Sequence, residues 1–220
     1  MVSFRDLKYK LERPSVNSDK AVILIPGIHG HALDDYRYDS LGNYLVANGF
    51  YFLRIEFWNS NEERGEYRLS DFHKILNEAV SFLKSFGCPK IGIVAKSFGG
   101  GIALSYKNPE LKANVIWAPA IGFSENSTFE KDKDMRLFNF GSVFDIKLSP
   151  IDLTKVTAPT LFIQGDEDKN VPMKNTEMLQ ANVLDSKLEI IEGANHQYDD
   201  PRMLRKVVDK TIEFLKRKVR

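Results

Sequence analysis

The stretch IGIVAKSFGGGIAL, residues 91–104, places Ser97 between a short apolar run and three consecutive glycines. The run IGIVA has the continuous apolar character of a strand that is buried on both faces. The glycines then open a segment with helical spacing, although each one costs roughly 1 kcal/mol of helix stability relative to alanine. We therefore predict a sharp turn from strand to helix at Ser97, with glycines that let the two elements pack closely.

Similar apolar runs recur along the chain and alternate with amphipathic segments. Strands are predicted at 21–25, 50–57, 91–95, 113–117, 160–164 and 187–191. Helices are predicted at 36–47, 70–86, 99–107, 173–184 and 202–217, with Ser70 as the N-cap of the second. This alternation is typical of an α/β fold in which a mostly parallel central sheet carries helices on both faces. Residues 2–12 are expected to add one or two antiparallel edge strands.

One segment interrupts the alternation. From Pro119 to about Val156 the chain is a polar and aromatic mixture that is longer than an ordinary connection. Loops of this length in compact domains are often lids or binding elements. With 220 residues, the chain fits a single domain, 1–220, with a short lid insert at about 119–156. The aromatic residues of the insert can either line an apolar pocket or simply anchor the insert to the domain.

The composition is that of an ordinary globular protein, with 43% hydrophobic and 28% charged residues and a formal net charge of +1. This balance gives no reason to expect nucleic acid or a membrane as a partner. No apolar run reaches the roughly 18 residues that span a bilayer, and the first residues lack the apolar centre of a secretory signal. The single cysteine, Cys88, excludes an intramolecular disulfide, so we expect a cytoplasmic location.

The position of Ser97 suggests a chemical role. A serine on a strand-to-helix turn, flanked by small residues such as Ala95 and Gly99, matches a nucleophile elbow. The helix start behind the serine supplies N–H groups and the positive end of a dipole, which suits the stabilisation of an oxyanion. The alternative is that Ser97 serves only as the N-cap of the helix.

A nucleophilic serine needs a base and an orienting carboxylate, and candidates for both follow later strands. Asp168 lies in GDEDKNVP, after the strand at 160–164, and His196 lies in EGANHQYDD, after the strand at 187–191. Asp166 competes with Asp168 for the role of the carboxylate. The order Ser97, Asp168, His196 is the order found in one fold in particular.

With PGIHG, AKSFGG, GDEDKNVP and GANH in this order, the chain resembles the α/β-hydrolase superfamily, and small acyl esterases and dienelactone hydrolases most of all. The resemblance extends from about residue 20 to the C-terminus. It implies that Ser97 is the nucleophile, that His196 is the general base and then the acid, and that Asp168 orients the imidazole. The spacing that relatives show also favours Asp168 over Asp166.

The resemblance further implies that the backbone N–H groups of Ile28 and Phe98 form an oxyanion hole. Two positions depart from the family pattern. Ala95 stands where the elbow usually has its first glycine, and Pro26 stands where many relatives have a histidine. Neither change removes a member of the predicted triad.

We accordingly expect a serine hydrolase that cleaves a small carboxylester through an acyl-enzyme intermediate. Its partner would be a small-molecule ester or acyl substrate, and the mechanism requires no metal and no organic cofactor. An acyltransferase, a thioesterase, a peptidase and a non-catalytic binding protein are the alternatives. The roles of His29, His31 and Lys96 and the oligomeric state are left open by the sequence.

Overall fold

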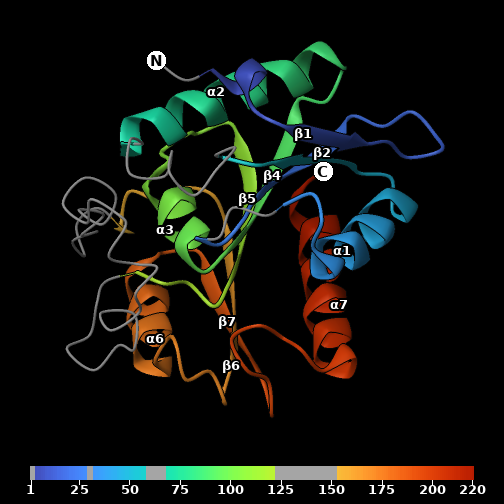
Figure 1. Cartoon of the computed structure of the whole chain (residues 1–220). Coiled ribbons are helices and arrows are strands. Elements are labelled where there is room, and N and C mark those ends of the chain that lie inside the picture. The colour runs from blue at the N-terminus through green and yellow to red at the C-terminus, as the bar shows by residue number, and fades with distance from the viewer. Residues whose placement is uncertain (1–2, 29–31, 58–67, 122–152) are drawn as a thin grey trace.

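The computed structural model describes residues 3–28, 32–57, 68–121 and 153–220 (Figure 1). Within these ranges a seven-stranded sheet has the order β1-β3-β2-β4-β5-β6-β7, in which only the β1–β3 pairing is antiparallel. The strands are β1 (Tyr9–Glu12), β2 (Lys20–Ile25), β3 (Tyr51–Ile55), β4 (Lys90–Lys96), β5 (Leu111–Trp117), β6 (Thr160–Gly165) and β7 (Ser186–Ile191).

Helices pack on both faces of the sheet, as Figure 1 shows, and each face has its own apolar core. One core contains side chains from α2 (Leu69–Ser85), α3 (Phe98–Ser105) and α6 (Met173–Asn182), together with the short 3-10 helix η1 (Phe4–Asp6). The other contains side chains from α1 (Tyr36–Ala47) and α7 (Pro201–Lys218). The predicted α/β architecture, with a mostly parallel sheet between two helical layers, is therefore confirmed.

The six apolar runs identified in the sequence all form strands, and residues 9–12 form the antiparallel edge strand expected near the N-terminus. The predicted N-cap of α2 is wrong. The helix begins at Leu69, so that Arg68 occupies the cap position and Ser70 lies inside the first turn. The reason is that the Asp71 side chain accepts the backbone N–H of Arg68 at 2.8 Å. This contact caps the helix at Arg68, two residues before the predicted position.

Most of the predicted lid insert lies outside the described residues. Its two ends are described, and they are anchored in the core on the α3 side of the sheet: Ile121 is buried at one end, and Leu153 and Val156 are buried at the other. The limits of the insert and the single-domain organisation stay predictions. In the part of the chain that the structure describes, no helix is both long enough and apolar enough to cross a membrane.

Helix α3 lies unusually close to the strands beneath it because it begins with glycines. A Cβ atom on Gly99 would lie 2.5 Å from the carbonyl oxygens of both Ile25 and Pro26, at the end of β2. A Cβ atom on Gly100 would lie 2.7 Å from Cγ2 of Ile116 in β5. These glycines therefore permit a close approach of backbone to backbone, and this gain offsets their poor helix propensity.

We expect Gly99→Ala to destabilise the fold, although helix propensity alone would predict a gain of about 1 kcal/mol. The new methyl group would overlap two carbonyl oxygens that belong to the backbone, so the expected loss is about 1–3 kcal/mol. Chemical denaturation measures it. Gly27→Ala is the control, because a Cβ there would make ordinary contacts at 3.6 Å and 3.8 Å. A stable Gly99→Ala variant would show that α3 tolerates a greater distance from β2.

Candidate active site

Ser97 lies on a strained turn between β4 and α3. Its backbone has φ 52° and ψ −119°, a conformation that a non-glycine residue adopts only at an energetic cost. Three backbone hydrogen bonds hold it there. The Ser97 N–H donates to the Trp117 carbonyl at 2.8 Å, while its own carbonyl accepts the N–H groups of Gly100 at 2.9 Å and Ala120 at 3.0 Å. These three hydrogen bonds fix the backbone of the turn at Ser97.

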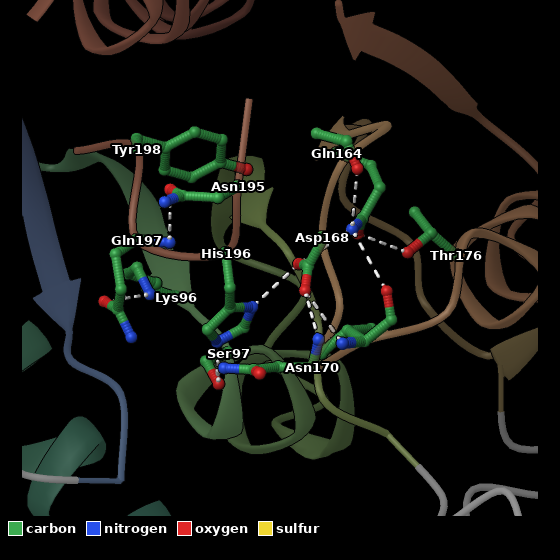
Figure 2. Close-up of polar contacts among 12 residues, drawn as sticks. Lys96, Ser97, Gln164, Asp168, Asn170, Thr176, Asn195, His196, Gln197 and Tyr198 are labelled. Atoms are coloured by element: carbon green, nitrogen blue, oxygen red, sulfur yellow. Dashed lines mark hydrogen bonds and ion pairs between the residues drawn. The ribbon is translucent and has the colours of Figure 1, made fainter. Parts of the chain in front are cut away.

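The Ser97 hydroxyl lies within hydrogen-bond distance of a histidine from the other end of the chain. Nε2 of His196, in the loop between β7 and α7, is 3.1 Å from Oγ of Ser97 (Figure 2). Nδ1 of the same ring is 2.7 Å from Oδ2 of Asp168, in the loop after β6. Both His196 and the Asp168 carboxylate are buried. The structure therefore brings together the three side chains that the sequence singled out.

The Asp168 carboxylate accepts several hydrogen bonds besides that of His196. Its Oδ1 accepts the backbone N–H groups of Asn170 at 2.8 Å and Val171 at 2.9 Å. Burial by itself raises the pKa of this carboxyl group, but the hydrogen bond and charge of His196, together with the two backbone donors, outweigh burial and lower the pKa. Asp168 is thus a carboxylate at neutral pH, with fixed geometry.

A second pair of buried side chains fixes the orientation of Asp168, and the sequence analysis missed it. Nε2 of Gln164 donates to Oδ2 of Asp168 at 2.9 Å, and Oε1 of Gln164 accepts the hydroxyl of Thr176 at 2.8 Å. Because an ionised carboxylate can only accept hydrogen bonds, the NH₂ group of Gln164 must face Asp168, and its amide oxygen is left to accept from Thr176. The available signal was a polar glutamine at the end of an otherwise apolar strand.

The competing carboxylate, Asp166, has a different contact. It accepts the backbone N–H of Gly193 at 2.7 Å and is exposed to solvent. Nearby, a Cβ atom on Gly165 would lie only 2.1 Å from the carbonyl oxygen of Ala194. The end of β6 and the loop that carries His196 therefore meet backbone to backbone. Asp166 supports this junction, while Asp168 contacts the imidazole.

The two predicted oxyanion donors both belong to segments that border Ser97. Phe98 is the first residue of α3, where backbone N–H groups point along the helix axis away from the helix body. Ile28 is buried and follows Gly27, whose position is close enough for an added Cβ to contact Cβ of Ser97 at 3.6 Å. The roles of the two N–H groups stay a prediction. His29 and His31 lie outside the described residues.

The sequence of this chain from residue 56 to residue 220 matches the model of the prolyl oligopeptidase family. The chain belongs to this family. Among curated proteins, a carboxymethylenebutenolidase homologue from Xenopus tropicalis is 24% identical over 195 residues, which are 81% of this chain and 68% of the relative.

Solved structures resemble this family member over almost its whole length. Est1E from Butyrivibrio proteoclasticus with bound ferulic acid has a TM-score of 0.81 at 19% identity, covering 97% of this chain and 95% of that one. A dienelactone hydrolase from Anabaena variabilis has a TM-score of 0.75 at 23% identity, covering 97% and 93%. A monoacylglycerol lipase from Paleococcus ferrophilus has a TM-score of 0.76 at 18% identity, covering 95% and 98%. These likenesses confirm the α/β-hydrolase fold.

In this prolyl oligopeptidase family member, a buried lysine precedes the serine on the turn. Lys96 is 3% exposed, and its Nζ donates to Oε1 of Gln197 at 3.3 Å. Burial, and after it the nearby charge of Arg37, lowers the pKa of Lys96 to about 7. The sequence left open whether this residue packs or acts on its surroundings, and the structure shows a titratable group next to the site.

The pKa of His196 is lowered as well. Burial is the main cause and the charge of Lys96 is the second, while the hydrogen bond to Asp168 acts in the opposite direction. A lowered pKa means that the imidazole is neutral at pH 7 and can accept a proton from the Ser97 hydroxyl. Within the described residues, no group of three or more His, Cys, Asp or Glu side chains is arranged to hold a metal ion.

Another histidine and serine form a contact of a different kind. The ring of His73, in α2, is half-buried, and its Nε2 lies 2.9 Å from Oγ of Ser105 in α3. The Ser105 hydroxyl donates to the Ile102 carbonyl at 2.8 Å. Because its proton is used in this bond, Ser105 accepts from His73, and the pair joins α2 to α3.

We expect Lys96→Met to stabilise the fold at pH 7 by a few kcal/mol, because a buried ammonium is replaced by an apolar side chain of similar length. Unfolded lysine keeps its proton up to about pH 10.4, whereas Lys96 releases it from about pH 7. The free energy of unfolding of the wild-type protein therefore increases as the pH rises from 7 to 10. The difference in this free energy between Lys96→Met and wild type becomes smaller over the same interval. Urea denaturation at pH 7, 8.5 and 10 tests this.

Lys90→Met is the matched control, since Lys90 begins the same strand and forms a partly exposed ion pair with Asp19 at 2.6 Å. Loss of such a pair costs no more than about 1 kcal/mol. If Lys96→Met were less stable than wild type at pH 7, the ammonium would contribute to the packing of the core.

Proposed function

We propose that the protein is a serine hydrolase that cleaves small carboxylesters, with Ser97 as the nucleophile, His196 as the base and Asp168 as the orienting carboxylate. One observation carries the proposal. An unbroken relay joins Oγ of Ser97 to Nε2 of His196 at 3.1 Å, and Nδ1 of His196 to Oδ2 of Asp168 at 2.7 Å. The relay lies at the carboxyl end of a mostly parallel sheet, where open α/β sheets bind their ligands.

The proposed reaction has two steps. In the first, His196 takes the hydroxyl proton as Oγ of Ser97 attacks the ester carbonyl, and the imidazolium then gives this proton to the leaving alcohol. In the second, His196 takes a proton from a water molecule as the water oxygen attacks the acyl carbonyl. The bond to Oγ of Ser97 then breaks, the imidazolium returns the proton to Oγ, and the free acid leaves. In each step the negative oxygen is stabilised by the backbone N–H groups of Ile28 and Phe98.

The fixed position of Asp168 contributes by keeping the imidazole in one orientation. Its carboxylate binds Nδ1–H, which leaves Nε2 as the lone-pair nitrogen that faces Ser97. The lowered pKa of His196 keeps that lone pair available at neutral pH. The strained turn at Ser97 and the N-terminus of α3 hold the nucleophile and one oxyanion donor next to each other.

Ester cleavage is preferred because the relatives named above include a carboxymethylenebutenolidase homologue, a monoacylglycerol lipase and a protein with bound ferulic acid. Peptide cleavage is the second candidate, and the match to the prolyl oligopeptidase family favours it. Both reactions use the same nucleophile, base and oxyanion donors, so the difference lies in the substrate pocket.

A fluorophosphonate probe is expected to label wild-type protein at a single residue, Ser97, as followed by intact mass and peptide mapping. Ser97→Ala removes the labelling. Asp168→Asn reduces the labelling rate by about 10⁴-fold, because the imidazole is then held in the wrong tautomer. Asp166→Asn is the matched control and keeps the rate within a few fold, since the Asp166 carboxylate accepts the Gly193 N–H and lies on the exposed side of the loop rather than against the imidazole. Unlabelled wild-type protein, or labelling that survives Ser97→Ala, contradicts the proposal.

Substrate class is tested with p-nitrophenyl esters of increasing acyl length beside a peptide p-nitroanilide. We expect kcat/KM for the best ester to exceed that for the anilide by at least about 100-fold, and to vary by about 10-fold or more with acyl length as the pocket fills. A glycerol or amine acceptor added to the reaction separates hydrolysis from acyl transfer. Faster cleavage of the anilide would favour the peptidase, and an excess of transferred over free acid would identify an acyltransferase.

A further inference from the structure

A cluster of charged and polar side chains lies directly behind the loop that carries His196. Gln197, the next residue along the chain, projects its amide oxygen toward Lys96 at the end of β4 (Figure 2). The same oxygen accepts a hydrogen bond from Nη1 of Arg37, in the first turn of α1. Nη1 of Arg37 also donates to the backbone carbonyl of Gln197 at 3.2 Å. Two cations from separate elements therefore hold the residue next to His196.

Arg37 is itself fixed by a carboxylate. Its Nε donates to Oδ1 of Asp35 at 2.8 Å, and its Nη2 donates to Oδ2 of the same residue. Asp35 is in addition the N-cap of α1, where it accepts the backbone N–H of Arg37 at 3.0 Å. The guanidinium thus has a defined position, and α1 is connected through it to the histidine loop.

The rest of the loop is held by local contacts. Oδ1 of Asn195 accepts the Gln197 N–H at 3.1 Å, and the hydroxyl of buried Tyr198 donates to the Ile163 carbonyl at 3.0 Å. Tyr198 has a φ of 56°, which turns the chain sharply after His196. The histidine loop therefore has several contacts besides the one with Lys96.

Charged groups of both signs act on Lys96. These are Arg37 and His196, which are or can become positive, and the carboxylates of Asp35, Asp168 and Asp199. Burial is the main cause of the lowered pKa of Lys96, and the residue is protonated below about pH 7. Lys96 is therefore positively charged at the acidic pH values at which His196 takes up its proton. Its effect on His196 is repulsive, and it is second only to burial.

We propose that Lys96 is a positioning residue that acts on His196: its hydrogen bond to Oε1 of Gln197, an oxygen shared with Arg37, holds a positive charge next to the histidine loop and keeps Nε2 of His196 unprotonated into mildly acidic solution. This inference rests on the proposed function of His196 as the general base. It names Lys96 as the group that sets the acid limit of the activity. An apolar side chain at this buried position would avoid the cost of desolvating an ammonium, so packing alone does not account for a lysine here.

The test is the pH dependence of fluorophosphonate labelling between pH 5 and 9, for wild type, Lys96→Met and Lys90→Met. The acid limb of the profile reports the proton uptake of the base in the free enzyme. We expect the acid limb of the Lys96→Met profile to move to higher pH. The ratio of its labelling rate at pH 6 to its plateau rate should be about threefold or more below the same ratio for wild type. The Lys90→Met limb stays in place, because that charge lies at the opposite end of β4. An unmoved limb in Lys96→Met, or a uniform loss of rate at all pH values, overturns the proposal.

Two further variants separate charge from shape and do not depend on how Lys96→Met folds. Lys96→Arg keeps a permanent positive charge. We therefore expect the acid limb of its pH profile at the same pH as in wild type, or at a lower pH. Gln197→Glu is nearly isosteric and neutralises part of the positive charge next to the histidine loop, so its limb is expected to move in the same direction as that of Lys96→Met. An acid limb that moves to higher pH in Lys96→Arg, or to lower pH in Gln197→Glu, contradicts a role for the charge.

Direct titration of His196 by NMR separates failure of this inference from failure of the proposed function. The His196→Asn variant assigns its ring signals among the four histidines of the chain. If the wild-type protein does not react with the probe, while the His196 pKa rises in Lys96→Met, then the electrostatic link stands and the hydrolase function is wrong. If the probe labels Ser97 and the His196 pKa is the same in both proteins, the inference about Lys96 is wrong.

Discussion

The close contact between α3 and the end of β2 is the constraint on which the site depends. Because Gly99 has no Cβ, the helix can begin directly above the carbonyl groups of Ile25 and Pro26. Ser97 must then turn the chain within one residue, which explains its φ of 52°. The hydrogen bonds from Ser97 to Trp117 and from Ala120 to Ser97 stabilise this conformation. The strain at Ser97 and its position at a helix N-terminus thus have one common origin in backbone packing.

A second backbone contact unites the other half of the site. Gly165 allows the end of β6 to touch the carbonyl of Ala194, so the loops that carry the carboxylate and the imidazole adjoin each other. Side chains then refine the arrangement: Gln164 donates to the Asp168 carboxylate, and Lys96 donates to Gln197, the residue after His196. Asp168 and Lys96 act on the imidazole in opposite directions. The carboxylate raises the pKa of His196, whereas burial and the lysine lower it.

The sequence was sufficient to predict the strands, the two helical layers and the order Ser97, Asp168, His196, because local periodicity and turn chemistry carry this information. It could not choose between Asp166 and Asp168 without the resemblance, since both follow the same strand two residues apart. Contacts such as Thr176 with Gln164, or Arg37 with Gln197, depend on how distant segments pack, and no local pattern encodes them. The error at Ser70 has a similar cause, because either of two nearby polar residues can cap a helix.

The buried residues Ile121 and Leu153 mark the two points at which the chain leaves and re-enters the core beside the site. They belong to the same apolar cluster as side chains of α3, the helix that follows Ser97. A polar substitution at either residue would therefore disturb the packing that supports this helix as well as the junction itself.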